Sequence, residues 1–284
     1  MKRQKKFLVN GGRLNHILGS LKILHSVKQM IWDQIKAEVL LRIEEEKSLK
    51  DYFQLLILSQ VDILSSVASI LASKLQTDAL KTSKIKELLL EALQSNTKII
   101  KEIEQDLLFF KNEDPACHHL STPLLFYKGF LGLACYRASH ALWINNRKTL
   151  ALFFQNRASE VLGIDIHPAA KIAGGIMIDH ATGVVIGETC TIESKVSIFQ
   201  GVTLGGKGNE SGGKRHPSIL EGASIFASST ILGDILVGKN AVVAAGSLVL
   251  KSVQENETVA GIPARRVRGL RQNKAEWDPG DSSL

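Results

Sequence analysis

The sequence predicts an α+β protein, in which an all-helical N-terminal domain is followed by a parallel β-helix of hexapeptide repeats with one extruded loop. Three observations lead to this prediction. Apolar residues recur at helical spacing over the first half, and branched apolar residues recur at every sixth position over the second. A glycine-rich segment interrupts the second pattern once. We therefore expect a basic N-terminal arm over residues 1–31, a helical domain over 32–163, a β-helix over 164–267 and a C-terminal tail over 268–284.

The N-terminal arm carries the whole excess of positive charge. The chain has 284 residues, with 35 Lys and Arg, 28 Asp and Glu, and a net charge of +7. The seven basic residues before Asp33, the first acidic residue, are Lys2, Arg3, Lys5, Lys6, Arg13, Lys22 and Lys28. Because the rest of the chain is balanced and the arm lacks the repeated interleaving of aromatic and basic residues used for base stacking, a solvated tail is favoured over a nucleic-acid-binding segment.

The same arm bears on localisation. It is basic and free of acidic residues, as a targeting peptide is, but it is poor in serine, and Gly11, Gly12 and Gly19 interrupt any helix. No stretch of the chain approaches the roughly 18 apolar residues that a membrane span needs. We expect a cytoplasmic protein without a membrane partner, and organelle import through the arm is the alternative.

The three cysteines, Cys117, Cys135 and Cys190, lie far apart in unlike contexts and form no paired motif. An odd and scattered set is typical of reduced thiols, whereas disulfide and zinc frameworks use regular spacings. We therefore expect free thiols and no metal site.

Helical spacing runs from about Trp32 to Arg147 and predicts helices with one buried face. The apolar stripes are Ile35, Val39 and Ile43; Leu55, Leu58, Val61 and Leu64; Ile85, Leu88, Leu89, Ala92 and Leu93; and Ile99, Ile103, Leu107 and Phe110. The last stripe is expected to end at Asp114-Pro115, because proline disfavours helix at the residue before it. A further helical pair is predicted over 123–162, with Asn145-Asn146 as its turn.

From Ile166 the period becomes six, which neither a helix nor an amphipathic hairpin sustains over so long a segment. The thirteen anchors are Ile166, Ile172, Ile178, Val184, Cys190, Val196, Val202, Ile219, Ile225, Ile231, Val237, Val243 and Val249. Hexapeptide repeats are the signature of a parallel β-helix whose coils have three short faces. The anchors predict slightly more than four coils, with each anchor stacked on its equivalent three hexapeptides further along the chain.

One break interrupts this series. The interval between Val202 and Ile219 is much longer than one hexapeptide, so about 11 residues are expected to leave the coil as a loop over 205–217. A long loop in a regular solenoid commonly lies where ligands or partners bind.

Eight motifs, read in order, resemble one enzyme family over about residues 30–270. They are Asp114-Pro115-Ala116-Cys117; Thr122-Pro123-Leu124-Leu125 with Lys128-Gly129-Phe130; Tyr136-Arg137 with His140; Asp165-Ile166-His167-Pro168-Ala169-Ala170; Ile176-Met177-Ile178-Asp179-His180-Ala181-Thr182-Gly183; Gly201-Val202-Thr203-Leu204-Gly205-Gly206; Arg215-His216-Pro217; and Ala260-Gly261-Ile262-Pro263-Ala264. The repeats and the last motif indicate only the hexapeptide acyltransferase superfamily. The sequence Asp-Pro-Ala, then Asp-His-Ala-Thr-Gly, then Arg-His-Pro resembles the serine acetyltransferases.

This resemblance implies a fold and an activity. The coil would be left-handed, against the usual right-handed crossover rule, and the prisms would form a homotrimer, or a hexamer made of two trimers joined by their helical domains. The enzyme would transfer acetyl from its co-substrate acetyl-CoA to the hydroxyl of L-serine in cysteine biosynthesis, with no bound cofactor. Because no serine or cysteine lies in a nucleophile motif, we expect serine to attack acetyl-CoA directly.

Acetyl transfer to a hydroxyl needs a base, and His180, beside Asp179, is the best candidate because histidine titrates in the right range. By resemblance, Asp165 would orient His180 and stabilise its imidazolium form. The spacing alone does not establish that contact. His180 follows Asp165 by less than one full coil of three hexapeptides, so the two lie in adjacent coils without being stacked.

The other site residues follow from the zwitterionic substrate. By resemblance, the carboxylates of Asp114 and Asp179 would bind the α-ammonium group of serine. Arg215 can hold its α-carboxylate through two hydrogen bonds, and His216 would complete the surroundings of the hydroxyl.

Three small residues are assigned to acetyl-CoA. The backbone N–H of Gly206 can stabilise the tetrahedral oxyanion, and Ala227 and Ala245 would contact CoA between subunits. Phe226-Ala227-Ser228 departs from the glycine-alanine-glycine pattern that the family has there.

The C-terminus departs from the family as well. Members often end in isoleucine, which enters the active site of O-acetylserine sulfhydrylase, but this chain ends in Leu284. That departure puts the sulfhydrylase complex in doubt.

Three other functions compete with this interpretation. Another hexapeptide acyltransferase, acting on sugars or antibiotics, would share the prism but not Asp114 or the helical domain. A γ-type carbonic anhydrase needs a close pair of zinc-binding histidines, which His167, His180 and His216 do not provide. A non-catalytic scaffold is expected to have lost His180 or Asp165, and neither is lost.

Overall fold

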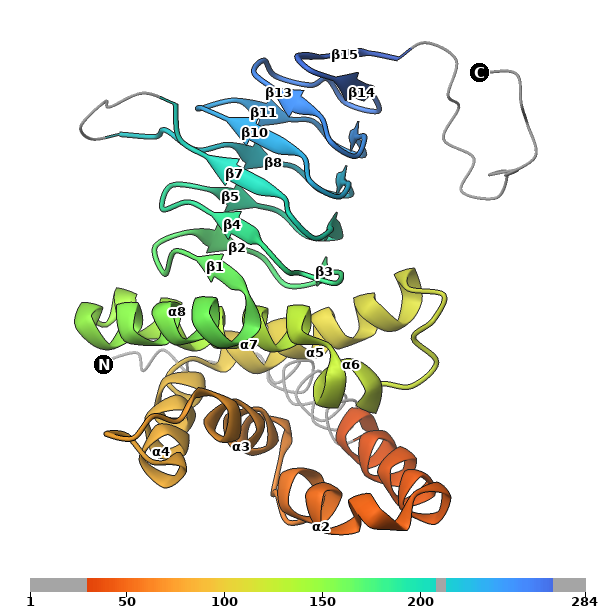
Figure 1. Cartoon of the computed structure of the whole chain (residues 1–284), viewed down its shortest axis with the longest axis vertical. Coiled ribbons are helices and arrows are strands. Elements are labelled where there is room, and N and C mark those ends of the chain that lie inside the picture. Colours follow the sequence, from red (N-terminus) through yellow and green to blue (C-terminus); the bar gives the residue numbers. More distant parts are fainter. Residues whose placement is uncertain (1–29, 208–212, 268–284) are drawn as a thin grey trace, which may run out of the picture.

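The computed structural model describes residues 30–207 and 213–267. The predictions for the basic arm up to residue 29 and for the tail with Leu284 fall outside these residues. A prism of stacked coils stands on a layer of helices, and further helices pack beneath that layer (Figure 1). None of the described helices combines the length and the apolar composition that a membrane span requires.

The lower helices follow the first apolar stripes with one exception. They comprise a helix over 30–45, a 3₁₀ turn at Lys47–Leu49, α2 (Lys50–Phe53), a π-helical segment at Gln54–Leu58, α3 (Ile63–Leu75) and α4 (Thr82–Gln94). The stripe predicted over 55–64 is wrong, since Leu55 is 64% exposed and Val61 is 82% exposed. Asp62 starts a new helix there, because its side chain accepts the Ser65 N–H and Ser65 Oγ accepts the Asp62 N–H in a capping box.

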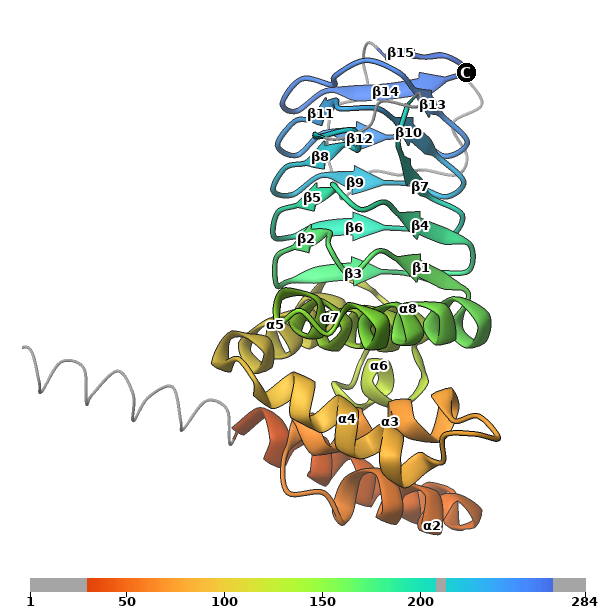
Figure 2. The ribbon, with the colours of Figure 1, turned by 90° about the vertical axis from the view of Figure 1, so that its left-hand side faces the viewer.

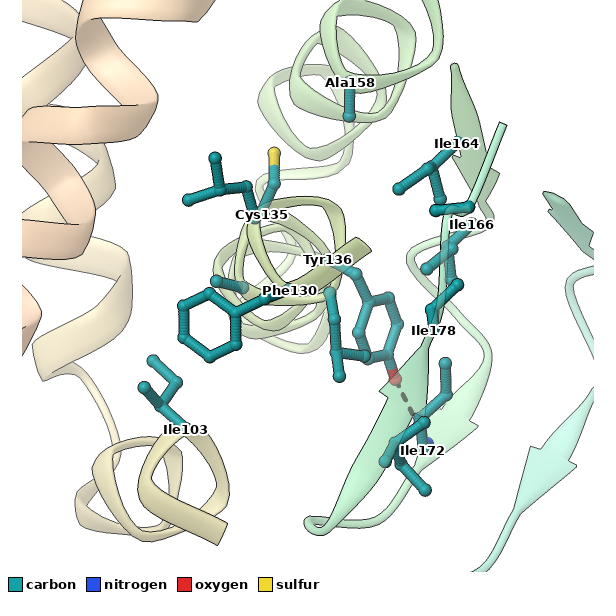
Figure 3. Close-up of a cluster of buried hydrophobic side chains, with 14 of the residues drawn as sticks. Ile103, Phe130, Cys135, Tyr136, Ala158, Ile164, Ile166, Ile172 and Ile178 are labelled. Atoms are coloured by element: carbon teal, nitrogen blue, oxygen red, sulfur yellow. Dashed lines mark hydrogen bonds between the residues drawn. The ribbon is translucent and has the colours of Figure 1, made fainter. Parts of the chain in front are cut away.

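The upper helices form the layer on which the prism stands. They are α5 (Thr97–Glu113), α6 (Ser121–Phe126), α7 (Lys128–Ile144) and α8 (Lys148–Leu162). As predicted, α5 buries its apolar stripe and ends before Asp114-Pro115, and Asn145-Asn146 forms the turn between α7 and α8. Most of α7 is buried, because it lies between the lower helices and the first coil; Figure 3 shows Phe130 and Tyr136 in this core with Ile164, Ile166 and Ile178.

The prism has three faces of parallel strands, and the coil winds in the left-handed sense (Figures 1 and 2). The first face holds β1 (Ile164–Ile166), β4 (Val184–Ile186), β7 (Thr203–Gly205), β10 (Thr230–Leu232) and β13 (Leu248–Val249). The second holds β2 (Lys171–Ile172), β5 (Thr191–Ile192), β8 (Ser218–Ile219) and β11 (Leu236–Val237). The third holds β3 (Ile176–Ile178), β6 (Val196–Ile198), β9 (Ser224–Ile225), β12 (Val242–Val243) and β14 (Thr258–Gly261), which pairs antiparallel with β15 (Ala264–Arg266). All thirteen predicted anchors are buried, which confirms the β-helix.

The predicted stacking of these anchors is wrong in the first coil. Ile166 pairs with Ile186 and Ile178 with Ile198, so this coil is two residues longer than the plain coil in which Ile186 pairs with Leu204. The two extra residues lie between β3 and β4. The sequence pattern did not reveal these two residues, because two rows of apolar residues are buried in the coil. Val184 lies two positions before Ile186 and Val196 two positions before Ile198, and all four are buried. The predicted period of six therefore passed from the first row to the second without a visible break.

The extruded loop is confirmed in place but not in length. Ile198 pairs with Ile225, a step that is nine residues longer than the plain coil from Ile186 to Leu204. The insertion is therefore slightly shorter than the sequence predicted. Residues 205–207 and 213–217 are the described parts of the loop.

A buried ion pair joins the helices to the first coil. Asp106 of α5 is 1% exposed and accepts two hydrogen bonds from Arg137 of α7, at 2.8 and 2.9 Å. It also accepts the N–H groups of Gly175 and Ile176 at 2.8 and 3.0 Å, at the start of β3. Burial raises the pKa of Asp106 to about 6, against the opposing charge of Arg137.

Tyr136 completes this junction beside the ion pair. Its hydroxyl donates to the Ala170 carbonyl at 2.6 Å. It also accepts the Ile172 N–H at 3.2 Å, the hydrogen bond drawn in Figure 3. Consecutive residues of α7 thus satisfy backbone groups at the lower edge of the coil, which would otherwise be buried without partners.

Replacing Arg137 by methionine should lower the free energy of unfolding by about 3–5 kcal/mol, because it leaves the Asp106 carboxylate buried without its cation. Urea denaturation at fixed protein concentration measures the change. The matched control is Arg147→Met, which removes an exposed pair with Glu91 and should leave the midpoint nearly unchanged. A wild-type midpoint for Arg137→Met would show that the ion pair does not hold the two parts together.

Candidate active site

The two extra residues of the first coil form the turn that carries His180. The backbone φ angles of His180 and Ala181 are 54° and 62°, a left-handed conformation that non-glycine residues adopt at a cost of about 1–3 kcal/mol each. The turn presents the His180 side chain outward, 73% exposed, and the His180 N–H donates to Asp179 Oδ1 at 2.8 Å. Backbone strain of this kind is concentrated at functional sites.

A pocket of about 380 Å³ lies beside this turn. It is lined by Asp114, Ala116, Phe126, Tyr127, Lys128, Gly129, Ile178, Asp179 and His180. Both predicted ammonium-binding carboxylates and the predicted base therefore line one cavity. The helices reach it closely because Gly129 has no side chain, and a Cβ there would lie 1.7 Å from the Ile178 carbonyl oxygen.

Asp114 enters the pocket from the end of α5. It is the C-terminal cap of that helix, and its Oδ1 accepts the Ala116 N–H at 2.8 Å. Tyr127, which the sequence did not single out, lines the same pocket as both acids. Burial first, and then the charge of Asp114 and a weaker effect of Asp179, raise the pKa of Tyr127 to about 12.

Arg215 and His216 lie away from this pocket. They pack against the corner that follows β4. His216 is buried against Gly187, where a Cβ would lie 2.2 Å from its Nε2. Thr189 organises this segment, because its Oγ1 accepts the N–H groups of Arg215 and His216 at 3.0 and 3.1 Å. Thr189 carried no signal in the sequence that would have marked it as part of the site.

Thr189 also fixes the form of the His216 ring. The Thr189 N–H donates to His216 Nδ1 at 3.2 Å, and the Thr189 hydroxyl lies 2.8 Å from the same nitrogen. Nδ1 is therefore the acceptor and Nε2 carries the proton of the neutral ring. Burial first, and then the charge of Arg215, lower the pKa of His216. His216 is thus a neutral donor toward the face on which Gly206 lies, where a Cβ on Gly206 would be 3.4 Å from Nε2.

Arg215 itself pairs with Glu188. Its Nη2 donates to the Glu188 carboxylate, and this hydrogen bond is the main reason why the pKa of Glu188 is lowered. Within residues 30–207 and 213–267, the Gly206 N–H has no hydrogen-bond acceptor, so it is available for an oxyanion as the sequence interpretation requires.

Asp165 does not meet His180 within one chain. Its carboxylate accepts the Gln155 side-chain N–H at 2.6 Å, and its charge acts on His167, whose pKa is lowered mainly by burial. In the described part of the chain there is no hydrogen bond or ion pair between Asp165 and His180. The charges of Glu188 and Arg215 also act on His167, which places Asp165 with the Arg215 cluster.

Ala227 and Ala245 lie on the His180 side. Corners of successive coils stack there, with Gly201 N–H donating to the Thr182 carbonyl, Ser228 N–H to that of Gln200, and Gly246 N–H to that of Ala227, each at 2.8 Å. The sequence interpretation missed an aromatic pair in this column. Phe199 and Phe226 stack with ring centroids 4.9 Å apart and an interplanar angle of 7°.

One chain therefore holds the predicted site residues in two separate groups, which we call half-sites, at opposite ends of the first face. The His180 half-site contains Asp114, Asp179 and His180, with Ala227 and Ala245 in the column above. The Arg215 half-site contains Asp165, Gly206, Arg215 and His216. Strand β4, about 10 Å long, lies between them. In the described residues, no group of three or more His, Cys, Asp or Glu side chains could hold a metal ion.

Comparison with known proteins finds relatives that match most of the chain. Residues 31–135 match the family described as "Serine acetyltransferase, N-terminal". Over 248 residues the chain is 46% identical to the serine acetyltransferase of Haemophilus influenzae, covering 87% of this chain and 92% of that protein.

Two solved structures are similar over most of their length. The serine acetyltransferase of Neisseria gonorrhoeae in complex with serine has 42% identity and a TM-score of 0.80, covering 83% of this chain and 96% of that chain. A serine acetyltransferase in complex with CoA has 45% identity and a TM-score of 0.81, covering 84% and 100%.

The environment of His216 predicts a titration that NMR can measure. Because burial and Arg215 disfavour its charged form, the ring should titrate below 6.5, with the ¹⁵N shifts of the Nε2–H tautomer. Glu188→Gln should lower the midpoint further, since the charge of Glu188 favours the imidazolium form. The His216→Asn spectrum assigns the signal. A midpoint at or above 6.5 would contradict the neutral donor.

Proposed function

The chain belongs to the serine acetyltransferase family, and from this premise we propose that it transfers acetyl from acetyl-CoA to the hydroxyl of L-serine, giving O-acetylserine and CoA for cysteine biosynthesis. The observation that carries the proposal is the pocket in which Asp114 and Asp179 flank the exposed His180. Two carboxylates beside a histidine suit a substrate that has both an ammonium group and a hydroxyl to be deprotonated.

We propose direct attack, with His180 as the general base. His180 takes the proton of the serine hydroxyl while the oxygen bonds to the thioester carbonyl carbon. The tetrahedral intermediate then expels the CoA thiolate as the C–S bond breaks, and the imidazolium returns its proton to the sulfur. Burial raises the pKa of Cys117 to about 11 and those of Cys135 and Cys190 to about 12, so none is a ready nucleophile for an acetyl-enzyme.

The two half-sites suggest how serine is held. We place its ammonium group between Asp114 and Asp179, and its carboxylate on the guanidinium of Arg215. Arg215 keeps its forked geometry because Glu188 already orients it. His216 offers its Nε2–H to the substrate oxygen, and the Gly206 N–H supports the oxyanion.

Such a site needs two copies of the chain. Because β4 separates the half-sites, we propose that the His180 half-site of one copy meets the Arg215 half-site of its neighbour in a trimer. Asp165 of the neighbour would then approach His180, as the sequence interpretation requires. Acetyl-CoA would run along the column of Ala227 and Ala245 above His180.

A dimer of trimers through the helical domains extends this proposal. Its support is the exposed apolar surface of the helix over 30–45, where Leu40 and Leu41 are 54% and 63% exposed. We place the enzyme in the cytoplasm, in line with its free cysteines. Association of the tail with O-acetylserine sulfhydrylase stays a prediction that Leu284 puts in doubt.

Removing the base tests the activity. Wild type should release thiol from acetyl-CoA when L-serine is added, and not with sugars or other amino acids. His180→Ala should lower kcat by about 10²–10⁴-fold with its circular dichroism spectrum unchanged. His118→Ala, an exposed histidine outside the pocket lining, is the matched control and should retain activity. A folded wild type without serine-dependent release would sink the proposal.

Mixing two inactive variants tests the shared site. His180→Ala and Arg215→Ala should each be inactive alone. When they are co-expressed with different tags and purified as mixed oligomers, one site in each mixed trimer should pair two intact half-sites, so about a third of wild-type activity should return, or about a quarter if two trimers associate at random. If each chain builds its own site, no activity returns, because every chain then carries one defect.

A further inference from the structure

Tyr127 forms part of the wall of the His180 pocket but has no role in the mechanism above. It is the residue between α6 and α7, and its N–H donates to the Pro123 carbonyl at 3.3 Å. Its ring packs against Phe110 of α5, with ring centroids 5.9 Å apart. The backbone and the ring are thus both fixed, and the side chain lines the pocket together with Asp114 and Asp179.

The carboxylates of Asp114 and Asp179 need hydrogen-bond donors nearby. In one pocket, two like charges repel each other unless hydrogen-bond donors or cations stabilise them. Each has one backbone donor, the Ala116 N–H for Asp114 and the His180 N–H for Asp179. The ammonium of Lys128, which also lines the pocket, donates to Thr182 Oγ1.

Tyr127 supplies a neutral donor at this point. The lining also includes Ala116, Phe126, Gly129 and Ile178, whose side chains offer no polar hydrogen. The phenol is protonated at neutral pH because its ordinary pKa is about 10, and burial and the neighbouring charge of Asp114 raise this pKa further, to about 12. A protonated phenol donates one hydrogen bond, and Asp114 is the acid whose charge affects it most.

We infer that Tyr127 is a positioning residue for the amino-acid substrate, which holds the Asp114 carboxylate in the orientation that binds the ammonium group. This inference rests on the proposed function, because it deepens the role of the same pocket. The hydroxyl orients one carboxylate oxygen and leaves the others free, so the substrate ammonium meets a preorganised pair of acids. The base His180 and the column for acetyl-CoA are not involved.

Tyr127→Phe keeps the ring on Phe110 and removes only the hydroxyl. We expect KM for L-serine to rise about three- to tenfold, while kcat and KM for acetyl-CoA change less than twofold. The matched control is Tyr52→Phe on α2, a tyrosine that is absent from the pocket lining and should leave all three constants unchanged. An unchanged KM for serine, or a fall in kcat alone, overturns the inference.

A substrate analogue separates positioning from a general effect on folding. Compared with serine, 3-hydroxypropanoate keeps the hydroxyl and the carboxylate but lacks the ammonium group. Its inhibition constant against serine should be nearly the same for wild type and Tyr127→Phe, because the lost hydrogen bond acts only through the ammonium site. A loss of affinity for both compounds by the same factor would show that the variant disturbs the whole pocket and would overturn the inference.

The failure of this inference differs from the failure of the proposed function. If wild type releases no thiol with serine, the proposed activity fails, and calorimetric titration of L-serine then decides on Tyr127. Weaker serine binding by Tyr127→Phe than by wild type supports the positioning role, and equal binding, or none to either protein, overturns it.

Discussion

The buried pair of Asp106 and Arg137 is the interaction on which the geometry of the pocket depends. Asp106 lies on α5, two turns before Asp114, and it binds the first N–H groups of β3, the strand that ends at Ile178 before Asp179. One carboxylate therefore fixes both elements that deliver the two acids of the pocket. Removing two charges from water costs several kcal/mol per ion, and the pair is held because Arg137, two backbone donors and the Ala173 carbonyl satisfy the buried polar groups.

The second constraint is the departure from regularity in the first coil. A regular corner would carry Ile178 into β4 with two residues fewer, and His180 would have no turn of its own. The residues of this turn, His180 and Ala181, adopt left-handed backbone conformations. Packing of the coils above and of the helices below offsets the strain energy of these conformations. The gain is an outward histidine whose N–H fixes Asp179. A regular solenoid thus supplies rigidity, and an irregular corner in its first coil presents an exposed histidine.

The Arg215 half-site follows a different rule. There a nine-residue insertion returns to the prism and is held by Thr189, whose hydroxyl accepts two consecutive N–H groups. This contact buries His216 in one tautomer and leaves Arg215 paired with Glu188 at the surface. Each half-site is preorganised by its own chain, so assembly of two copies would need only rigid surfaces to meet. The proposed division of the site between copies would also make activity depend on assembly.

The sequence by itself determined the two periods, the place of the loop, and the residue types that the chemistry needs, because burial and motif identity are local properties of the chain. It did not determine which residues meet. Stacking in the coil was misread by two positions, since two rows of apolar residues are buried and either row fits a period of six. The partner of Asp165, the place of Tyr127 in the pocket of two acids and the support from Thr189 depend on contacts between different elements. Only the tertiary structure decided these contacts, because they depend on how the coils close and on how α5 to α7 dock beneath them.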